Sequence, residues 1–570
     1  MKYFTRRELT PVERDQYGMM PDLVAHLLYH RGIVDSESAQ RFISPDYDRD
    51  THNPFLLKDA EKSAERIIRA IKNNEKIAVY ADYDADGIPG AALFDDFLRR
   101  IGFSNYIVYI PHRHNEGFGL NVDAIEQLAD QGVKLIITID CGISDFMPVQ
   151  YANEKGLEVI ITDHHEPPSE LPKAFAIVDH KQVDCNYPDK NLCGSGVAYK
   201  LIQAILVKER FGLREGHEKW LLDLVGMATL SDMVPLVGEN RVFAHYGLTV
   251  IRKTQRKGLV RLLSMLRINQ RYLSEDDIAF MITPRINAAS RMGVPTDAFK
   301  LLSADNDADA EYYAKHLDEI NNERKGIVAS LVKEVKKTVR DRHSGSIPSV
   351  IVLGNPTWRP ALLGLAANSC AEEFNCQVFL WGRDGDNLIK GSCRSEGQTH
   401  VVDLMRAVPS GILAQFGGHK FSGGFSVVNE SVHFLEKHLN DAFEKISNGQ
   451  SVADTADFID AELGIDQITA DLYDEISKLA PFGTGNPKPI FIFRNVVPVK
   501  VRKFGKGNDH LEFGFKRKDG SMLSAIAFFG ANNEKFTNIK EGQSLDLIAS
   551  IEQSMFRGRA EIRLRVVDVC

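Results

Sequence analysis

Three short apolar runs, each ending abruptly in acidic or histidine residues, constrain the fold of this chain more than any other feature. Lys76–Ala81 leads into Asp82-Tyr-Asp84-Ala-Asp86-Gly87, Val133–Ile139 into Asp140-Cys-Gly142, and Leu157–Thr162 into Asp163-His164-His165. Each run is rich in β-branched residues and has the length of a strand that is buried on both faces.

Amphipathic segments at 90–100, 121–130 and 147–155 separate these runs and have helical spacing. Alternation of buried strands with helices predicts a parallel, doubly wound α/β sheet. Such sheets bind ligands beyond the carboxyl ends of their strands. We therefore expect the three polar clusters to converge on one crevice.

The Asp82–Gly87 turn carries three carboxylates at alternate positions. Three negative charges so close together need a cation to offset their repulsion. The sequence of this turn begins like a calcium-binding EF-hand loop. In such a loop the twelfth position is a bidentate Glu, but here it is Leu93. A donor set rich in Asp, with few His and no Cys, favours manganese or magnesium. Six donors exceed the need of one catalytic ion and predict two, which can activate water for phosphodiester hydrolysis. They are Asp82, Asp84, Asp86, Asp140, His164 and Asp232.

The chain has 570 residues, enough for three to four domains. We expect an N-terminal segment, an α/β catalytic domain, a helical connector, a second α/β domain and a C-terminal β-barrel. Their expected bounds are 1–50, 51–245, 246–345, 346–450 and 451–570. The connector should contain helices over 250–273 and 308–342, interrupted only by Gly258 and Gly326.

Charge distribution is more informative than the net charge of −9. The stretch Val250–Leu273 contains seven Lys and Arg residues and no acid, which suits either a nucleic-acid surface or a solvated helix face. The barrel region interleaves basic residues with Phe504, Phe513 and Phe515, a pattern typical of single-strand binding, although alternating Phe equally fits a barrel core. The basic residues there include Arg502, Lys503 and Lys506.

Localisation follows from what the sequence lacks. No apolar run reaches the roughly 18–20 residues of a membrane span, and the N-terminus has no secretory signal pattern. The seven cysteines form no C-x-x-C pair, so we expect reduced thiols and a cytoplasmic protein.

Taken in order, the motifs resemble those of the DHH phosphoesterases, and within them the bacterial RecJ single-strand-specific exonucleases, over nearly the whole chain. The matching segments are Ala81–Gly87, Ile110–Arg113, Glu116–Leu120, Thr138–Gly142, Ile161–His165, Gly194–Ala198, Asp223–Asp232, Pro284–Arg291, Gly391–Ser395, Phe416–His419 and Pro481–Pro487.

The resemblance implies two manganese ions on the six donors, with magnesium as the alternative. It implies catalytic roles for Asp84, Asp140 and His165, Asp140 bridging the ions and His165 lying beside the scissile phosphate. A 5′-terminal phosphate would be bound by Arg113, Ser392 and Arg394, with Arg291 and His419 lining the cleft. Two parts of the chain would then fix the strand end before hydrolysis.

The implied function is 5′-to-3′ exonuclease action on single-stranded DNA, in repair and recombination. We expect a monomer, with a single-stranded DNA-binding protein and a helicase as partners. Two alternatives stay open: hydrolysis of nanoRNA, cyclic dinucleotides or pyrophosphate, and DNA binding without cleavage, as in related replisome subunits.

Three positions depart from the family pattern. Asp179-His180 replaces an Asn-Pro, Arg359 stands where His is common, and Phe421-Ser-Gly423 replaces small residues. None of them is one of the six donors.

Overall fold

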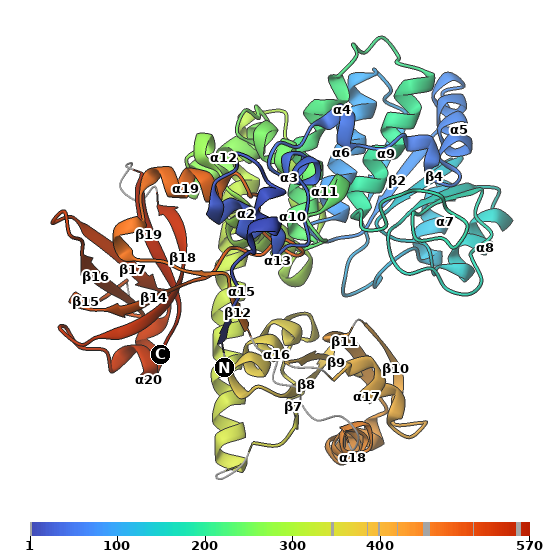
Figure 1. Cartoon of the computed structure of the whole chain (residues 1–570). Helices are drawn as coiled ribbons and strands as arrows, with labels where there is room; N and C mark the ends of the chain where they lie inside the picture. Colours follow the sequence, from blue (N-terminus) through green and yellow to red (C-terminus); the bar gives the residue numbers. More distant parts are fainter. Residues whose placement is uncertain are drawn as a thin grey trace. The chain divides into compact units, whose positions relative to one another are not determined.

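The computed structural model describes residues 3–343, 347–384, 386–396, 399–418, 420–447, 457–505, 507–554 and 560–570. The chain divides into two compact units (Figure 1). The first unit comprises Met1–Tyr109, Gly119–Ile282 and Ala456–Cys570, and the second comprises Ile110–Phe118 and Thr283–Thr455.

The α/β part of the first unit is built on a five-stranded, all-parallel sheet. Its strands lie in the order β3 (Tyr106–Tyr109), β2 (Ile77–Ala81), β4 (Leu135–Ile139), β5 (Glu158–Thr162) and β6 (Ala176–Val178). The predicted parallel sheet is therefore confirmed, and the three apolar runs are the neighbouring strands β2, β4 and β5.

Helices cover both faces of this sheet. On one face, α7 (Val122–Asp130) and α8 (Phe146–Glu154) bury Ile125 and Val149 against Tyr80 and Ile136. The other face is covered by α5 (Ala60–Lys72), α6 (Gly87–Arg100) and α9 (Gly194–Lys208), which also pack on one another. Apolar cover on both sides explains why the strands lack polar alternation.

Helices α10 (Leu222–Ser231), α11 (Gly238–Ile251) and α12 (Lys257–Met265) follow α9. The basic stretch Val250–Leu273 is therefore not one helix interrupted only by Gly258, because the chain turns between α11 and α12. Arg256 in that turn is buried in ion pairs with Asp96 (2.5 Å) and Asp223 (2.6 Å). For Arg256, both interpretations offered above are wrong, because its partners are acids distant in the sequence.

The C-terminal part of the first unit is a seven-stranded sheet. Its strands lie in the order β13 (Ala461–Glu462), β14 (Phe491–Val496), β18 (Leu545–Ser554), β19 (Glu561–Val569), β17 (Met522–Ala527), β16 (His510–Lys516) and β15 (Pro498–Phe504). Short helices α19 (Ala470–Ser477) and α20 (Glu534–Thr537) accompany it. Ladder pairing does not close this sheet into a ring within the described residues.

The N-terminal helices share the core of this seven-stranded domain. They are α2 (Asp22–Tyr29) and α3 (Ser36–Ile43); α1 (Pro11–Asp15), which buries no residue, precedes them, and α4 (Tyr47–Asp50) follows them. Leu27 and Leu28 of α2 are buried in one cluster with Phe491 and Phe513. Strand β1 (Tyr3–Thr5) also pairs in parallel with β12 (Asp457–Ile459).

The second unit combines helices with a mixed sheet. Helices α13 (Thr283–Met292), α14 (Thr296–Leu302) and the 36-residue α15 (Asp307–Arg342) precede strands in the order β10 (Leu413–Gly418), β11 (Ser422–Val427), β9 (Asp386–Ser395), β8 (Gln377–Asp384) and β7 (Val350–Gly354). Helices α16 (Pro360–Phe374), α17 (Val401–Ala407) and α18 (Leu435–Ser447) complete it. Only β7 and β8 pair in parallel.

Among the helices of the described residues, none is both long enough and apolar enough to cross a bilayer.

Candidate functional site

The acidic and histidine residues begin where the hydrogen-bonded ladder of the parallel sheet ends. The backbone N–H of Asp82 donates to the carbonyl of Ile139 (3.1 Å), and that of Asp140 donates to Thr162 (3.0 Å). The last backbone hydrogen bond between neighbouring strands therefore fixes each polar cluster to the strand end beside it. The predicted convergence at the carboxyl ends of β2, β4 and β5 is confirmed.

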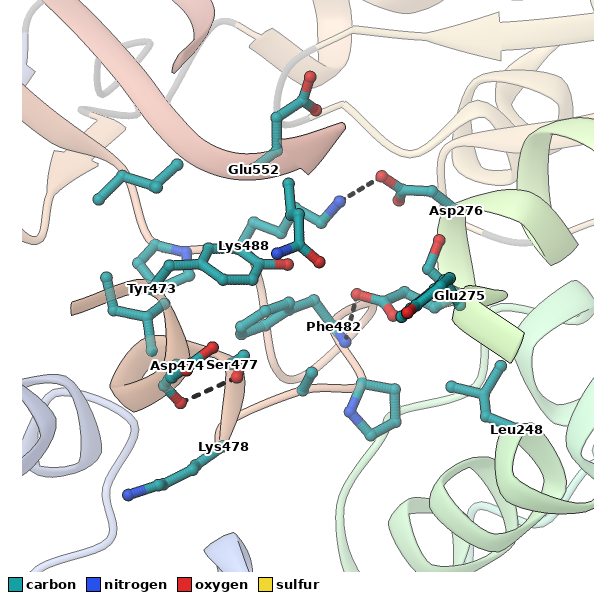
Figure 2. Close-up of a pocket in the computed structure, with 18 of the residues that line it drawn as sticks. Leu248, Glu275, Asp276, Tyr473, Asp474, Ser477, Lys478, Phe482, Lys488 and Glu552 are labelled. Carbon is teal, nitrogen blue, oxygen red and sulfur yellow. Dashed lines mark hydrogen bonds and ion pairs between the residues drawn. The ribbon is translucent and has the colours of Figure 1, made fainter. Parts of the chain in front are cut away.

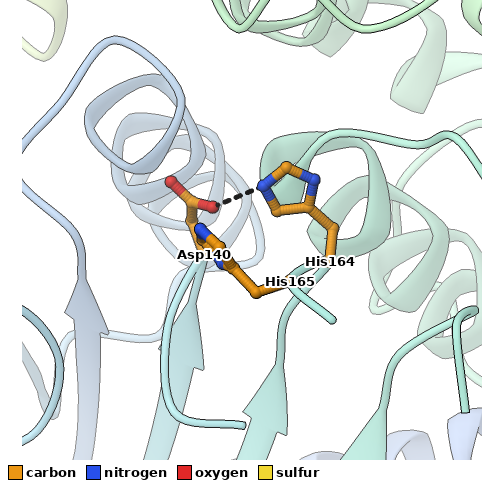
Figure 3. Close-up of side chains that lie close together, drawn as sticks. All are labelled: Asp140, His164 and His165. Atoms are coloured by element: carbon orange, nitrogen blue, oxygen red, sulfur yellow. Dashed lines mark ion pairs between the residues drawn. The ribbon is translucent and has the colours of Figure 1, made fainter. Parts of the chain in front are cut away.

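The His164 ring lies among carboxylates from three other segments. Its Nε2 is 3.1 Å from Asp140 Oδ1, and 3.8 Å from a carboxylate oxygen of both Asp86 and Asp232. Figure 3 shows the imidazole of His164 directed at Asp140. Asp232 is the C-terminal cap of α10, so residues as far apart in sequence as 86 and 232 meet at one imidazole.

The potential ligand atoms fall into three overlapping groups, in each of which they lie within 4.8 Å of one another. These groups are Asp82, Asp84 and Asp140; Asp86, His164 and Asp232; and Asp140, His164 and His165. All six predicted donors are thus brought together, and Asp140 belongs to two of the groups. Five carboxylates and an imidazole in one cluster form a donor set that suits manganese or magnesium.

Two glycines allow the close approach of backbone segments at the cluster. A Cβ on Gly87 would lie 2.4 Å from the Asp82 carbonyl oxygen, and one on Gly194 would lie 2.5 Å from Asp140 Cβ. Gly194 begins α9, where the backbone N–H groups of Gly194 and Ser195 donate to the Asp86 carboxylate (2.6 and 2.8 Å). The positive end of α9 therefore orients Asp86.

Electrostatics at the cluster favour a bound cation. Burial, followed by the charges of Asp86 and Asp84, raises the pKa of Asp140 well above its usual range. Burial and the same two carboxylates raise the pKa of Asp232 to about 9. Burial outweighs the neighbouring acids and lowers the pKa of His164, so that its neutral form can act as a ligand. Divalent cations would offset the repulsion among these carboxylates, so the residues fit a metal site.

Asp163 and His165 form a second, distinct pair. Burial disfavours the charged ring of His165, but its hydrogen bond from Nδ1 to Asp163 Oδ1 (2.8 Å) and the charge of Asp163 raise its pKa to about 9. The same Asp163 carboxylate accepts the backbone N–H groups of His164 (2.7 Å) and Ile143 (2.9 Å). Asp163 thus holds the whole turn and keeps His165 protonated at neutral pH.

Sequence reasoning missed three residues that position this site. The Asp163-His164-His165 motif does not by itself assign a role to Asp163, although a buried acid between a strand and two histidines signals an orienting role. Gly194 and Ser195 lie in the matching segment Gly194–Ala198, but their residue types do not reveal the role, because the contacts to Asp86 are made by backbone N–H groups.

The predicted phosphate-binding residues lie in the second unit. That unit includes the Ile110–Phe118 loop with Arg113, where His114 Nε2 lies 3.3 Å from the Arg291 carbonyl oxygen. Arg291 donates to the Ala361 carbonyl in the first turn of α16 (2.8 Å). A Cβ on Gly364, also in α16, would lie 2.9 Å from Arg394 Nη2, so Arg394 packs on the same helix. Arg113, Arg291, Ser392 and Arg394 are therefore assembled in one unit.

Arg394 is the most informative of these cations. Burial lowers its pKa, and no carboxylate of the described residues forms an ion pair with it. Ser392 lies two residues before it on the same strand, β9. A buried guanidinium without an acidic partner is costly unless an anion binds. His419 lies outside the described residues.

The departures Asp179-His180 and Arg359 have different surroundings. Burial is the main cause that lowers the pKa of His180 to about 3, and neither ring nitrogen has a hydrogen-bond partner in the described structure. His180 belongs to none of the potential metal groups found there. Arg359 is exposed at the N-cap of α16, with Nη1 4.0 Å from Met292 Sδ.

In the C-terminal domain, Phe513 and Phe515 are core residues with 1% and 0% exposure, as the core interpretation predicts. Arg502 forms an ion pair with Glu512, and Lys503 is exposed. Lys506 lies outside the described residues.

A cavity of about 610 Å³ lies between the C-terminal domain on one side and α11 and residues 271–276 on the other (Figure 2). Lys488 pairs with Asp276 there, and Glu275 accepts the backbone N–H of Phe482 (3.3 Å). Its lining holds four Lys and Arg side chains and four Asp and Glu side chains. These charges balance, so the cavity does not have the character of a phosphate site.

Comparison with known proteins identifies the three folded parts. The DHH family, N-terminal domain, matches residues 76–229, the DHHA1 domain matches 348–448 and the RecJ OB domain matches 459–568. The chain is 33% identical to the single-stranded-DNA-specific exonuclease RecJ of Bacillus subtilis over 96% of this chain and 67% of that protein.

Two solved structures are similar. RecJ from Thermus thermophilus in complex with Mn²⁺ superposes with a TM-score of 0.81 at 24% identity, covering 100% of this chain and 79% of that one. A manganese-bound exonuclease RecJ gives a TM-score of 0.58 at 29% identity, over 70% of this chain and 96% of that one.

Fold and site together define a phosphoesterase of the DHH class, a metal-dependent hydrolase. Within that class, the chain belongs to the RecJ family of exonucleases. The match to the RecJ OB domain also identifies the seven-stranded sheet as an OB-fold.

Proposed function

We propose that this chain removes nucleotides from the 5′ end of single-stranded DNA by phosphodiester hydrolysis, in DNA repair and recombination. The observation that carries the proposal is the convergence of five carboxylates and the His164 imidazole at the ends of β2, β4, β5 and α10. Such a cluster serves metal-assisted hydrolysis, and the relatives act on single-stranded DNA according to their names.

The metal ligands are Asp82, Asp84, Asp86, Asp140, His164 and Asp232. They would hold two manganese ions, with magnesium as the alternative, and Asp140, which belongs to two of the potential ligand groups, would be the ligand that the two ions share. When bound, the ions supply activation of water and neutralise charge on the phosphodiester. The manganese-bound relative and the oxygen-rich donor set both support this assignment.

His165 contributes a positive charge and a proton. Its Nδ1 is engaged by Asp163, so Nε2 is the nitrogen that can meet the substrate. With a pKa of about 9 the ring is an imidazolium at neutral pH. It therefore donates a hydrogen bond to the scissile phosphate and holds a proton available to the leaving oxygen.

The second unit binds the 5′-terminal phosphate. Arg394 and Arg291, which both contact α16, supply guanidinium donors, and Ser392 and Arg113 add a hydroxyl and a further guanidinium; these groups match phosphate geometry. His419 completes the set. Arg502, Lys503 and Lys506 of the OB-fold neutralise phosphates further along the strand.

The same proposal includes the place of the protein in the cell and its partners. The chain acts as a cytoplasmic monomer, beside a single-stranded DNA-binding protein and a helicase that exposes 5′ tails. Residues 51–245, 346–450 and 451–570 are its DHH, DHH-associated and OB domains, with an N-terminal segment at 1–50 and a helical connector at 246–345.

The test is digestion of DNA labelled at either end, with manganese or with chelator, beside a blunt duplex. We expect early, manganese-dependent release of the 5′ label from single strands only, and loss of 5′-phosphate preference in Arg394→Met. Exposed Arg406→Met in the same unit is the matched control. Release from the 3′ end, or turnover confined to dinucleotides, would refute the proposal.

A further inference from the structure

The loop Ile110–Phe118 follows β3 of the parallel sheet but groups with the second unit, together with Thr283–Thr455. It carries Arg113, one of the proposed phosphate-binding residues. A mobile loop loses conformational entropy when it binds a ligand, so a loop that is already fixed binds more tightly. The contacts that hold this loop therefore bear on how a phosphate is recognised.

Within the loop, the residues around Arg113 form a tight turn. The His112 carbonyl accepts the backbone N–H groups of Asn115 (3.1 Å) and Glu116 (2.8 Å). The Glu116 carboxylate accepts the backbone N–H of His112 (2.6 Å), and His112 Nδ1 accepts that of His114 (3.3 Å). Arg113 thus lies in a turn whose backbone is fixed by hydrogen bonds on both sides of it.

One side chain of the turn reaches outside it. His114 Nε2 lies 3.3 Å from the carbonyl oxygen of Arg291, near the C-terminal end of α13. Because a carbonyl oxygen only accepts, Nε2 carries the hydrogen and donates it. The His114 residue is half-buried, so water competes less for this hydrogen bond than it does at an exposed site. His114 therefore links the turn that contains Arg113 to a second proposed phosphate-binding residue.

Arg291 continues this link to α16. Its Nη1 donates to the Ala361 carbonyl in the first turn of that helix (2.8 Å), and the next turn of the helix packs against Arg394. A continuous series of contacts thus runs from the loop through His114, Arg291 and α16 to Arg394. Guanidinium groups that bind one phosphate must keep their mutual spacing, because bidentate hydrogen bonds depend on geometry.

We propose that His114 is a positioning residue for the 5′-phosphate. Its hydrogen bond to the Arg291 carbonyl sets the place of the Arg113 turn relative to Arg291 and Arg394. The inference rests on the proposed function and adds a residue to the phosphate site. His114 is not itself a phosphate ligand in this proposal, because it acts through Arg113.

Three substitutions separate the hydrogen bond from the shape of the ring. His114→Gln places an amide N–H close to the position of Nε2 and should keep the bond. His114→Asn is too short to reach the carbonyl, and His114→Phe keeps a ring but lacks the N–H. We expect the Gln variant to match wild type and the other two to share one defect. Because Asn introduces no apolar ring, a defect common to Asn and Phe comes from the lost hydrogen bond.

The measurement is binding in chelator, so that no strand is cut, of full-length protein to short single strands labelled at the 3′ end. Each strand is prepared with a 5′-phosphate and with a 5′-hydroxyl, and the ratio of the two Kd values reports recognition of the phosphate alone. We expect His114→Phe and His114→Asn to reduce this ratio roughly fivefold, the usual effect of one lost hydrogen bond. The Kd of the 5′-hydroxyl strand and the melting temperature should not change. His433→Phe, at an exposed histidine of the same unit, is the matched control.

A double-mutant cycle tests whether His114 acts through Arg113. In an Arg113→Met background, His114→Phe should reduce the Kd ratio no further, because the group that it positions is already absent. Equal reductions in both backgrounds would overturn the positioning role. An unchanged ratio in His114→Phe would overturn it as well, and so would an equal loss of affinity for 5′-phosphate and 5′-hydroxyl strands.

Wild-type protein separates this inference from the proposed function. If manganese-dependent digestion releases no 5′ label, the proposed function fails, while the Kd ratios still decide the role of His114. If wild type binds both kinds of strand equally well, the phosphate site is refuted, and the role of His114 with it. If wild type prefers the 5′-phosphate and His114→Phe keeps that preference, only the role of His114 fails.

Discussion

Asp140 is buried beside four other carboxylates, and burial and these charges all raise its pKa. Replacing it by Asn keeps its shape and removes its charge. We expect Asp140→Asn to reduce hydrolysis roughly 100-fold or more. In chelator, however, its melting temperature should equal or exceed that of wild type.

Manganese-dependent shifts in melting temperature provide a second measurement for this variant, since a ligand that binds only the folded state stabilises it. Asp145→Asn is the control: burial raises the pKa of Asp145 to about 6, but Asp145 lies outside the potential metal groups of the described structure. Undiminished turnover in Asp140→Asn would contradict the two-metal assignment.

His180 predicts a dependence of stability on pH. Its pKa is about 3 in the folded protein and about 6.5 when unfolded, so the unfolded chain binds more protons between these values. Stability from the neutral ring is therefore complete above about pH 6.5 and decreases as the pH falls toward 3. The loss between pH 7.5 and 5.5 is about 1 kcal/mol.

Thermal melting of His180→Gln at these two pH values, in chelator, checks this expectation. The variant should lose less stability on acidification than wild type does, whereas replacing the exposed His433 by Gln should change nothing. Equal acid sensitivity of His180→Gln and wild type would show that the ring is not buried in its neutral form.

Some residues of the site can be located from the sequence, whereas others cannot. Asp82, Asp140 and His164 could be found because a buried strand that ends in polar residues has one physical explanation. Arg256 could not be assigned, because its partners Asp96 and Asp223 come close only after folding.

At the scale of elements, the N-terminus of α9 supports two sides of the metal cluster. Its N–H groups orient Asp86, and Gly194 allows Asp140 to approach. Gly194→Ala should push these carboxylates apart, destabilise the protein by about 1–3 kcal/mol and weaken manganese binding.

The measurement for Gly194→Ala is its melting temperature with and without manganese, together with its rate of hydrolysis. Gly326→Ala in α15 is a matched control, because a Cβ at Gly326 meets nothing within 4 Å. That change should stabilise the helix by up to about 1 kcal/mol. Equal manganese responses in the two variants would rule out a role for the α9 terminus.

Element prediction succeeded where periodicity is strong. The helices expected at 90–100, 121–130 and 147–155 are α6, α7 and α8, with boundaries within three residues. It failed at 250–273, where a turn stabilised by buried Arg256 separates α11 from α12. Long-range ion pairs of this kind do not change the local spacing of apolar residues in the sequence.

At the scale of the whole chain, the N-terminal helices belong to the OB-fold core. Arg241 on α11 links the N-terminal helices to the C-terminal domain. It donates hydrogen bonds to the carbonyls of Phe42 (2.7 Å) and Ala480 (3.0 Å). A chain that lacks residues 1–45 would expose the apolar face that covers Phe491 and Phe513.

We therefore expect the truncated chain to bind a hydrophobic dye and to be cut by protease within residues 457–570, while its parallel sheet stays resistant. Leu27→Asp should have the same effect in the full-length chain, and Val12→Asp, at an exposed site, should not. A protease-resistant OB-fold in the truncated chain would contradict the shared core. Sequence alone could not reveal this core, because no local pattern links segments more than 400 residues apart.

Strand β1 pairs with residues near 457. During biosynthesis, β1 therefore has to wait for these residues to be made. At roughly 5–20 residues per second, the ribosome needs about 20–90 s to make the intervening chain. During that interval the amphipathic helices α2 and α3 have left the exit tunnel but lack their partner. Nascent chains of this family member should therefore depend on a chaperone until translation is nearly complete.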